Sequence, residues 1–334
     1  MNETCATLPT RLARSSGWRR WGWAALFGAV ATLALPPVCG VPLLLIAVPG
    51  LLWLLDGVGE PRSAFALGWW FGFAYFGFGL YWISFALLTD IAQFWWLMPV
   101  AIAGLPALMA IFTGLVTMTV WSLGGRGLVR VVTFATVWVI AEWLRGHLFT
   151  GFPWQLVGYC WVDYSEVLQT AAVTGVYGLS LLTMLVAGLP ALLADPSVPR
   201  RRALMALACG LTLFASLAVA GTWRLASAEV ETVAGVRLRL VQANIDQGRK
   251  WADSEREGNF QRHLEMSVAP SALGKGWQPT VVIWPETAIA YFLAQDVRHR
   301  AAVAAAVPPG GLILTGAPRA TLEPKVAPRA TLEP

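Results

Sequence analysis

Long apolar stretches separated by short polar ones occupy the first two thirds of the chain. A helix needs roughly 20 mostly apolar residues to cross about 30 Å of hydrocarbon. The first two stretches are short and flank Pro36 and Pro37, so they form either two spans or one re-entrant hairpin. The pattern predicts about seven spanning helices, at Trp21–Val38, Val41–Leu55, Ala64–Leu88, Phe94–Trp121, Val129–Leu144, Leu168–Ala194 and Ala203–Trp223.

The hydrophobic period changes after the last predicted span. Residues Val236–Val241 alternate between apolar and basic side chains, which is typical of a strand with one buried face. The predicted order is strand Val236–Val241, helix Asp253–Ala269, strand Val281–Trp284, helix Phe292–Val307 and strand Leu312–Gly316. This alternation predicts an α/β layer fold. Three strands are too few for an α/β domain with both faces of its sheet covered, so the fold is expected to be partial.

Composition places the chain in a membrane. It is 57% apolar and only 13% charged, whereas soluble domains carry about 25% charged residues. Its 18 Trp and 15 Phe side chains suit a protein with many anchors at the membrane–water interface. The formal charge of +5 does not indicate a nucleic-acid partner, because the arginines lie in short loops between apolar stretches.

The arginines predict the orientation, because loops on the cytoplasmic side are enriched in basic residues. With the N-terminus inside and seven spans, everything after Trp223 lies outside. The outer loops of the bundle then carry Arg145, with Arg224 just after the last span. The inner segments then carry Arg11, Arg14, Arg19, Arg20, Arg62, Arg126, Arg130, Arg200, Arg201 and Arg202.

Four regions follow from these patterns: a cytoplasmic segment (1–20), a transmembrane bundle (21–223), a partial extracytoplasmic domain (229–316) and a tail (317–334). The tail repeats eight residues identically, as Ala317–Pro324 and Ala327–Pro334. Each copy holds two prolines, which suit neither a regular strand nor a helix. We therefore expect this tail to be disordered.

Two polar positions merit separate interpretation. Glu142 and Arg145 stand three residues apart at the outer end of the fifth predicted span, close to His147. They predict an interfacial ion pair that anchors a helix end, or alternatively a polar rim for a lipid head group.

Glu286 is the strongest candidate for chemistry. It follows the short apolar run Val281–Trp284 and Pro285, which restricts the preceding residue to extended geometry and ends the strand. A carboxylate just beyond the carboxyl end of a strand lies where α/β folds commonly place their sites. On this hexapeptide alone, a solvated loop glutamate is the favoured interpretation, and it is the rest of the chain that favours a site.

Several short sequences, in this order, carry a resemblance to a known family. They are Gly151–Trp154, Gly158–Tyr159, Gly175–Ser180, Val241–Ile245, Lys250–Trp251 and Trp284–Glu286. Together they resemble bacterial apolipoprotein N-acyltransferases, in which a membrane bundle carries a nitrilase-like domain, an α-β-β-α sandwich of the carbon–nitrogen hydrolase superfamily. The resemblance extends along nearly the whole chain up to Gly316.

The resemblance implies a two-step acyl transfer in the bacterial inner membrane, with the second domain on the periplasmic side. A phospholipid donates an acyl chain to a cysteine, and the α-amine of a diacylglyceryl-cysteine on an apolipoprotein attacks the thioester. Glu286 matches the family's general base, and Trp251 matches a tryptophan near the acyl site. The implied partners are the phospholipid donor, the apolipoprotein acceptor and the bilayer. Neither a cofactor nor a metal is implied.

The sequence also departs from the family pattern. The family's nucleophile is a cysteine and its oxyanion-stabilising residue a lysine, but no cysteine follows Cys209 and Lys325 lies inside the repeated tail. We therefore expect a C-terminally truncated enzyme that carries one of three catalytic residues and is inactive alone. The alternative is a non-catalytic membrane remnant that binds lipid or lipoprotein. A transporter is disfavoured, because ionisable residues are nearly absent from the middle of the spans.

Overall fold

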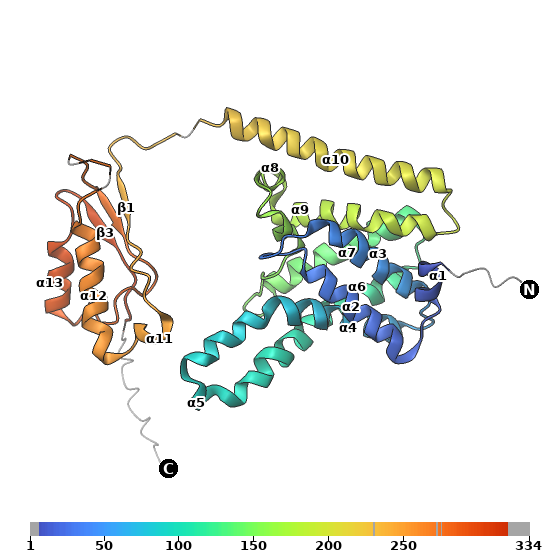
Figure 1. Ribbon diagram of the computed structural model, residues 1–334, viewed down its shortest axis with the longest axis horizontal. Coiled ribbons are helices and arrows are strands. Elements are labelled where there is room, and N and C mark those ends of the chain that lie inside the picture. Colours follow the sequence, from blue (N-terminus) through green and yellow to red (C-terminus); the bar gives the residue numbers. More distant parts are fainter. Residues whose placement is uncertain (1–6, 230, 272, 275, 320–334) are drawn as a thin grey trace, which may run out of the picture. The chain divides into compact units, whose positions relative to one another are not determined.

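The computed structural model describes residues 7–229, 231–271, 273–274 and 276–319 of the chain. Contacts divide the chain into two compact units, Met1–Ala228 and Glu229–Pro334 (Figure 1). The first is a helical bundle and the second is a small α/β unit. Lys325 and most of the repeated tail lie outside the described residues.

Among its described residues, the helical unit contains five helices long and apolar enough to cross a membrane. They cover Pro61–Leu88, Ile91–Leu123, Gly127–His147, Ala171–Ala194 and Arg200–Ser227, and coincide with the last five predicted spans. The first two predicted spans fall on shorter helices, α2 (Gly17–Thr32) and the apolar stretch Val41–Asp56. α2 ends well before Val38, since Pro36 and Pro37 cannot supply the backbone donors that would continue it.

The long helical stretches are not uniform. The first of them, Pro61–Leu88, is α4 (Pro61–Leu80) followed by a 3-10 segment, η2 (Tyr81–Asp90). The remaining elements are α1 (Leu8–Ala13), η1 (Val41–Leu43), α3 (Leu44–Asp56), α5 (Ile91–Phe94), η3 (Trp95–Leu97), η4 (Val100–Gly104), α6 (Leu105–Leu123), α7 (Gly127–His147), η5 (Val157–Trp161), α8 (Ser165–Leu168), α9 (Ala171–Gly188), η6 (Leu189–Ala194) and α10 (Arg200–Ser227). Gly175 interrupts α9 with a φ of 66°, a backbone conformation that glycine adopts without steric cost.

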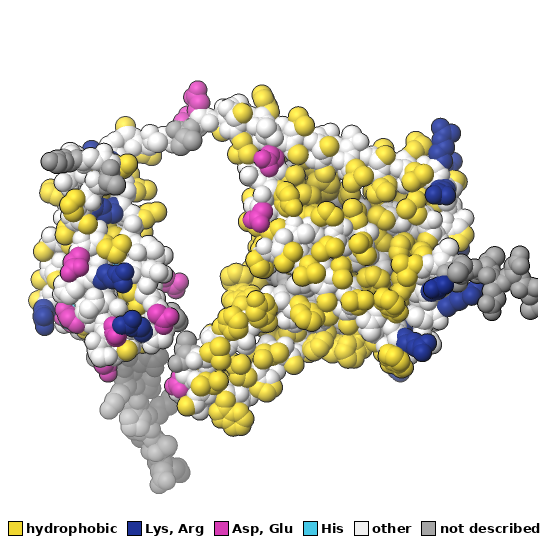
Figure 2. Space-filling model, in the orientation of Figure 1, with side chains coloured by type: hydrophobic (Ala, Val, Ile, Leu, Met, Phe, Trp, Pro, Cys, Tyr) yellow, Lys and Arg dark blue, Asp and Glu magenta, His cyan; other side chains and the backbone are white. Residues whose placement is uncertain are grey.

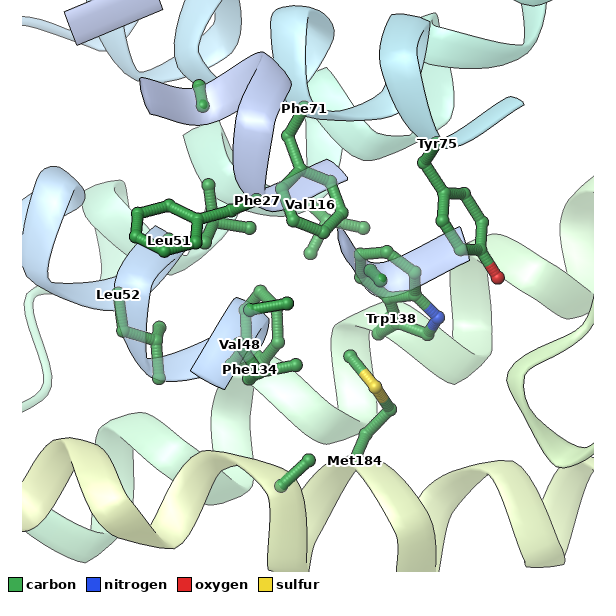
Figure 3. Close-up of a cluster of buried hydrophobic side chains, with 14 of the residues drawn as sticks. Phe27, Val48, Leu51, Leu52, Phe71, Tyr75, Val116, Phe134, Trp138 and Met184 are labelled. Carbon is green, nitrogen blue, oxygen red and sulfur yellow. The ribbon is translucent and has the colours of Figure 1, made fainter. Parts of the chain in front are cut away.

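Small residues let the central helices approach closely. A Cβ placed on Gly28 of α2 would lie 2.0 Å from the carbonyl oxygen of Phe71 in α4. Thr117 of α6 donates from its hydroxyl to the carbonyl oxygen of Ala64 at 2.7 Å. Such contacts replace the hydrophobic driving force, which is missing between helices in lipid. Around them packs an apolar core that includes Phe27, Leu51, Phe71, Phe134, Trp138 and Met184 (Figure 3).

The surface of the helical unit is mostly apolar, as a lipid-facing surface would be. On the face shown in Figure 2, the Lys and Arg side chains of this unit gather at the end that carries α1 and the start of α10. Basic side chains gathered at one end are what the predicted orientation expects.

The α/β unit is built on three parallel strands, β1 (Leu238–Leu240), β2 (Val281–Ile283) and β3 (Leu312–Leu314), in that order across the sheet. The other elements are α11 (Gln247–Lys250), α12 (Asp253–Val268) and α13 (Val297–Ala305). All three strands and both longer helices occur where the sequence predicts them. The second helix begins at Val297 rather than Phe292, because the Asp296 side chain accepts from the backbone N–H of His299 and caps it there.

The described residues cover only one face of the sheet. Val282 at the centre of the sheet is buried under α12 and α13, together with Phe260 and Trp284. The leucines that point to the opposite face, Leu238, Leu240, Leu312 and Leu314, are exposed. The unit is therefore a two-layer α/β arrangement, and the four-layer sandwich implied by the resemblance stays a prediction.

Candidate active site at the carboxyl ends of β1 and β2

Glu286 lies in a turn directly after β2, held by its neighbours on both sides. The backbone N–H of Trp284 donates to Leu314 of β3 at 2.9 Å, and its indole N–H donates to the Ser267 hydroxyl at 2.7 Å. On the other side, Thr287 adopts a φ of 49°. The strand end is thus fixed in the sheet and in the core, while the Glu286 side chain itself is exposed.

A cavity of about 130 Å³ opens beside this turn. Three segments form its wall: the chain that follows β1, one face of α12, and the turn after β2. Its lining residues are Gln242, Ala243, Asn244, Ile245, Lys250, Arg256, Asn259, His263, Pro285, Glu286, Thr287, Ala288 and Ala290. Glu286 therefore shares a polar cavity with two cationic side chains at the carboxyl edge of the parallel sheet, where α/β folds bind their ligands.

Lys250 connects the two strand ends. Its Nζ donates to the backbone carbonyl oxygen of Glu286 at 3.2 Å and lies 5.8 Å from the centre of the Trp251 ring. Asp246 caps α11 by accepting from the backbone N–H of Gly248, which sets the direction of this segment. Trp251 itself is 48% exposed and flanks the cavity without lining it. The structure thus places the Lys250–Trp251 pair next to the Glu286 turn.

His263 is the most buried polar side chain of the cavity wall, with 1% of its surface exposed. Its Nδ1 donates to the carbonyl oxygen of Asn259 at 2.7 Å, because a carbonyl can only accept. Burial lowers the pKa of His263, and the positive charges of Arg262 and Lys250 lower it further. The lowered pKa favours the neutral imidazole of His263 at the wall that also carries Lys250 and Glu286.

A polar cluster behind the cavity ties α12 to α13. The two ring nitrogens of His299 face Glu257 at 3.0 Å and Asp296 at 2.5 Å, and Tyr291 donates to Glu257 at 3.1 Å. Hydrogen bonds from Gln261 and His299 hold the pKa of Glu257 at about 2. The cluster fixes the helix whose face carries Arg256, Asn259 and His263.

Sequence reasoning singled out Glu286, which lines the cavity, and Trp251, which does not, as site residues. Arg256, Asn259 and His263 are spaced i, i+3 and i+7, which places them on one face of α12. This spacing is visible in the sequence, but nothing in it shows that the polar face turns toward the strand ends.

The predicted ion pair in the helical unit does not form. Glu142 and Arg145 are both 4% exposed, and no salt bridge joins them among the described residues. Glu142 accepts instead from the backbone N–H of Val157 at 2.8 Å, and Arg145 donates to the carbonyl of Phe152 at 2.8 Å. Both side chains hydrogen-bond to backbone groups of the following loop. They therefore anchor this loop and form no open rim.

These features define a class: a multi-pass membrane protein that carries an α/β unit with a carboxylate at a strand end. Residues 27–189 match the model of the apolipoprotein N-acyltransferase N-terminal domain. The chain belongs to the apolipoprotein N-acyltransferase family.

Curated relatives extend this match along both units. The chain is 39% identical over 321 residues to the apolipoprotein N-acyltransferase of Allorhizobium ampelinum, covering 93% of this chain and 60% of the relative. It is also 39% identical over 312 residues to that of Rhodopseudomonas palustris, covering 91% and 58%. It is likewise 39% identical over 327 residues to the apolipoprotein N-acyltransferase of Brucella melitensis, covering 94% of this chain and 60% of the relative. The chain thus spans about 60% of the length of the curated relatives it matches.

Proposed function

We propose that this chain provides the membrane bundle and the general base for transfer of an acyl chain from a phospholipid to the α-amine of a diacylglyceryl-cysteine. The observation that carries the proposal is Glu286, exposed in the turn after β2 and lining a polar cavity. A carboxylate in such a position can accept a proton from a thiol or an amine. Trp251, beside Lys250, is the candidate for contact with the acyl group.

The proposed reaction runs through a thioester and needs a cysteine thiolate as nucleophile. No cysteine follows Cys209 in the sequence. Cys160 in the helical unit is fully buried, and burial raises the pKa of its thiol. We therefore propose that the sequence acts only together with a nucleophile that it does not contain, and that alone it forms no acylated product. The same observation supports the alternative, a membrane protein that binds lipid or lipoprotein without catalysis.

We further propose that the α/β unit faces the periplasm and that the bundle lies in the inner membrane. The support is the distribution of arginines, which gather at one end of the helical unit (Figure 2). In that orientation the Glu286 cavity is on the side where diacylglyceryl apolipoproteins are presented.

A chimera tests the catalytic role of Glu286. Residues 1–316 are joined to the remaining part of the Allorhizobium ampelinum relative, which family resemblance predicts to supply the nucleophile. The chimera is incubated with phosphatidylethanolamine and a diacylglyceryl peptide, and N-acylated peptide is measured by mass spectrometry. Glu286→Gln should lower the rate by about 10²–10⁴-fold, the usual contribution of a general base.

Glu265→Gln is the matched control, since Glu265 is an exposed glutamate of α12 that does not line the cavity. It should leave the rate unchanged. Equal rates for Glu286→Gln and the unsubstituted chimera would reject the proposed base. Product formed by the sequence without any added part would reject the need for a further nucleophile.

A further inference from the structure

α10 approaches the rest of the helical unit closely at two glycines. A Cβ on Gly210 would lie 2.7 Å from the Leu189 side chain, and one on Gly221 would lie 1.7 Å from the carbonyl oxygen of Glu166. Elsewhere the helix is largely unpacked, since only 11% of its most apolar window is buried. Two tight contacts about three helical turns apart therefore hold a helix that is otherwise open to its surroundings.

Between these contacts lies an apolar cavity of about 220 Å³. Leu211 and Phe214 of α10 form one wall, and Val186 and Ala187 of α9 form the facing wall. Leu45 of α3 and Trp161 of η5 close it. We call this cavity the α9–α10 groove.

The few polar atoms of the α9–α10 groove already have partners. The indole N–H of Trp161 donates to the Thr183 hydroxyl at 2.8 Å, and that hydroxyl donates to the carbonyl of Leu179 at 2.7 Å. The Tyr164 hydroxyl donates to the carbonyl of Cys39 at 3.1 Å. Water would find few free partners here, and apolar cavities of about 150 Å³ stay dry and take up hydrocarbon ligands.

The groove is continuous with the lipid-facing surface. Leu211 lines it while 51% of the residue remains exposed, and Leu204, Leu213 and Val219 extend the same exposed apolar surface along α10. An empty groove would leave its wall atoms without dispersion partners. A polypeptide segment would bring backbone polar groups into a site that cannot satisfy them. A hydrocarbon chain supplies dispersion contacts to the wall and brings no polar group into the groove.

We propose that the α9–α10 groove binds the acyl chain of a bilayer phospholipid. The site is independent of Glu286 and of the acyl-transfer proposal, because all of its lining residues belong to the helical unit. The bound chain fills the space between α9 and α10 and completes the packing of α10 against the bundle.

Lipid retention tests the proposal. The full chain is reconstituted with 1-palmitoyl-2-oleoyl-phosphatidylethanolamine, washed with delipidating detergent and analysed by native mass spectrometry. One phospholipid should remain bound. Leu211→Trp, which places a larger side chain at the groove, should lower the retained fraction by about tenfold or more, equivalent to about 1.4 kcal/mol. Leu213→Trp, on the same helix but outside the groove, should retain lipid as the unsubstituted protein does.

A second measurement removes any dependence on the folding of Leu211→Trp. A benzophenone amino acid in place of Leu45 is activated in intact membranes, and the adducts are identified by mass spectrometry. A phospholipid adduct supports the proposal. Crosslinks to α10 alone would show a closed groove, and adducts with free fatty acid or with another protein would assign a different occupant. Equal lipid retention by Leu211→Trp and Leu213→Trp would place the bound lipid elsewhere. Each of these results overturns the proposal.

Discussion

At the scale of single residues, the geometry around Glu286 depends on how its neighbours are restrained. Pro285 ends β2, Trp284 is anchored in the core by its indole N–H, and Lys250 reaches the Glu286 carbonyl from the segment after β1. The place of Glu286 could be predicted from the sequence, because an apolar run followed by proline ends a strand. The neighbours of Glu286 in the cavity could not be predicted, because Lys250 and His263 come close to Glu286 only once β1 and α12 have packed against β2.

Glu257 gives a prediction at the same scale. Its pKa lies at about 2 in the folded protein and near 4.5 without its partners. A depressed carboxyl pKa adds stability above pH 4.5, and this contribution is lost as the pH falls from 4.5 toward 2. The protection factors of the amides in α12 and α13, which compare the observed exchange with the intrinsic rate at each pH, should therefore fall over that range in the full chain.

Glu257→Gln should remove most of this pH dependence, leaving only the part due to Asp296, whose pKa is also lowered by His299. Glu265→Gln keeps the cluster intact and should behave like the unsubstituted protein. If the protection factors in Glu257→Gln fall with acid as much as in the unsubstituted protein, the cluster does not stabilise the two helices.

At the scale of elements, apolar length predicts the long helices well and their junctions poorly. α4, α6, α7, α9 and α10 all coincide with predicted spans, because about 20 apolar residues in succession have few alternatives to a helix. The kink at Gly175 and the loop contacts of Glu142 and Arg145 were not predictable. Each depends on tertiary contacts that the local sequence does not encode, and helical spacing alone suggested a direct ion pair.

The loop between α7 and α9 should depend on Arg145. Arg145→Met removes the donors to the part-buried backbone carbonyls of Phe152 and Trp154 and to the buried carbonyl of Gln155. An unpaired buried polar group costs about 1–3 kcal/mol, so we expect the free energy of unfolding to fall by about that amount. Thermal unfolding in detergent measures it. His147→Asn, at an exposed position of the same helix end, should have little effect, and an unchanged Arg145→Met would remove the anchoring role.

At the scale of the whole molecule, the arginines predict which side each unit occupies. We expect a cytoplasmic N-terminus and a periplasmic α/β unit, since basic loops stay inside. Alkaline phosphatase fused after Ser227 should be active, because it folds only after export, and a fusion after Leu123 should be inactive. The reverse pattern would contradict the orientation and with it the periplasmic position proposed for Glu286.

The uncovered leucine face of the sheet has a consequence for how the α/β unit responds to heat and denaturant. Unfolding raises the heat capacity mainly by exposing apolar surface that the native state had hidden. Leu238, Leu240, Leu312 and Leu314 are already exposed, so they add little to that change. The heat-capacity increment per residue should lie below the usual range of about 12–15 cal/mol/K, and the denaturant dependence should be correspondingly shallow. Because this apolar surface is already in contact with water, the heat capacity of the native unit lies closer to that of its unfolded chain.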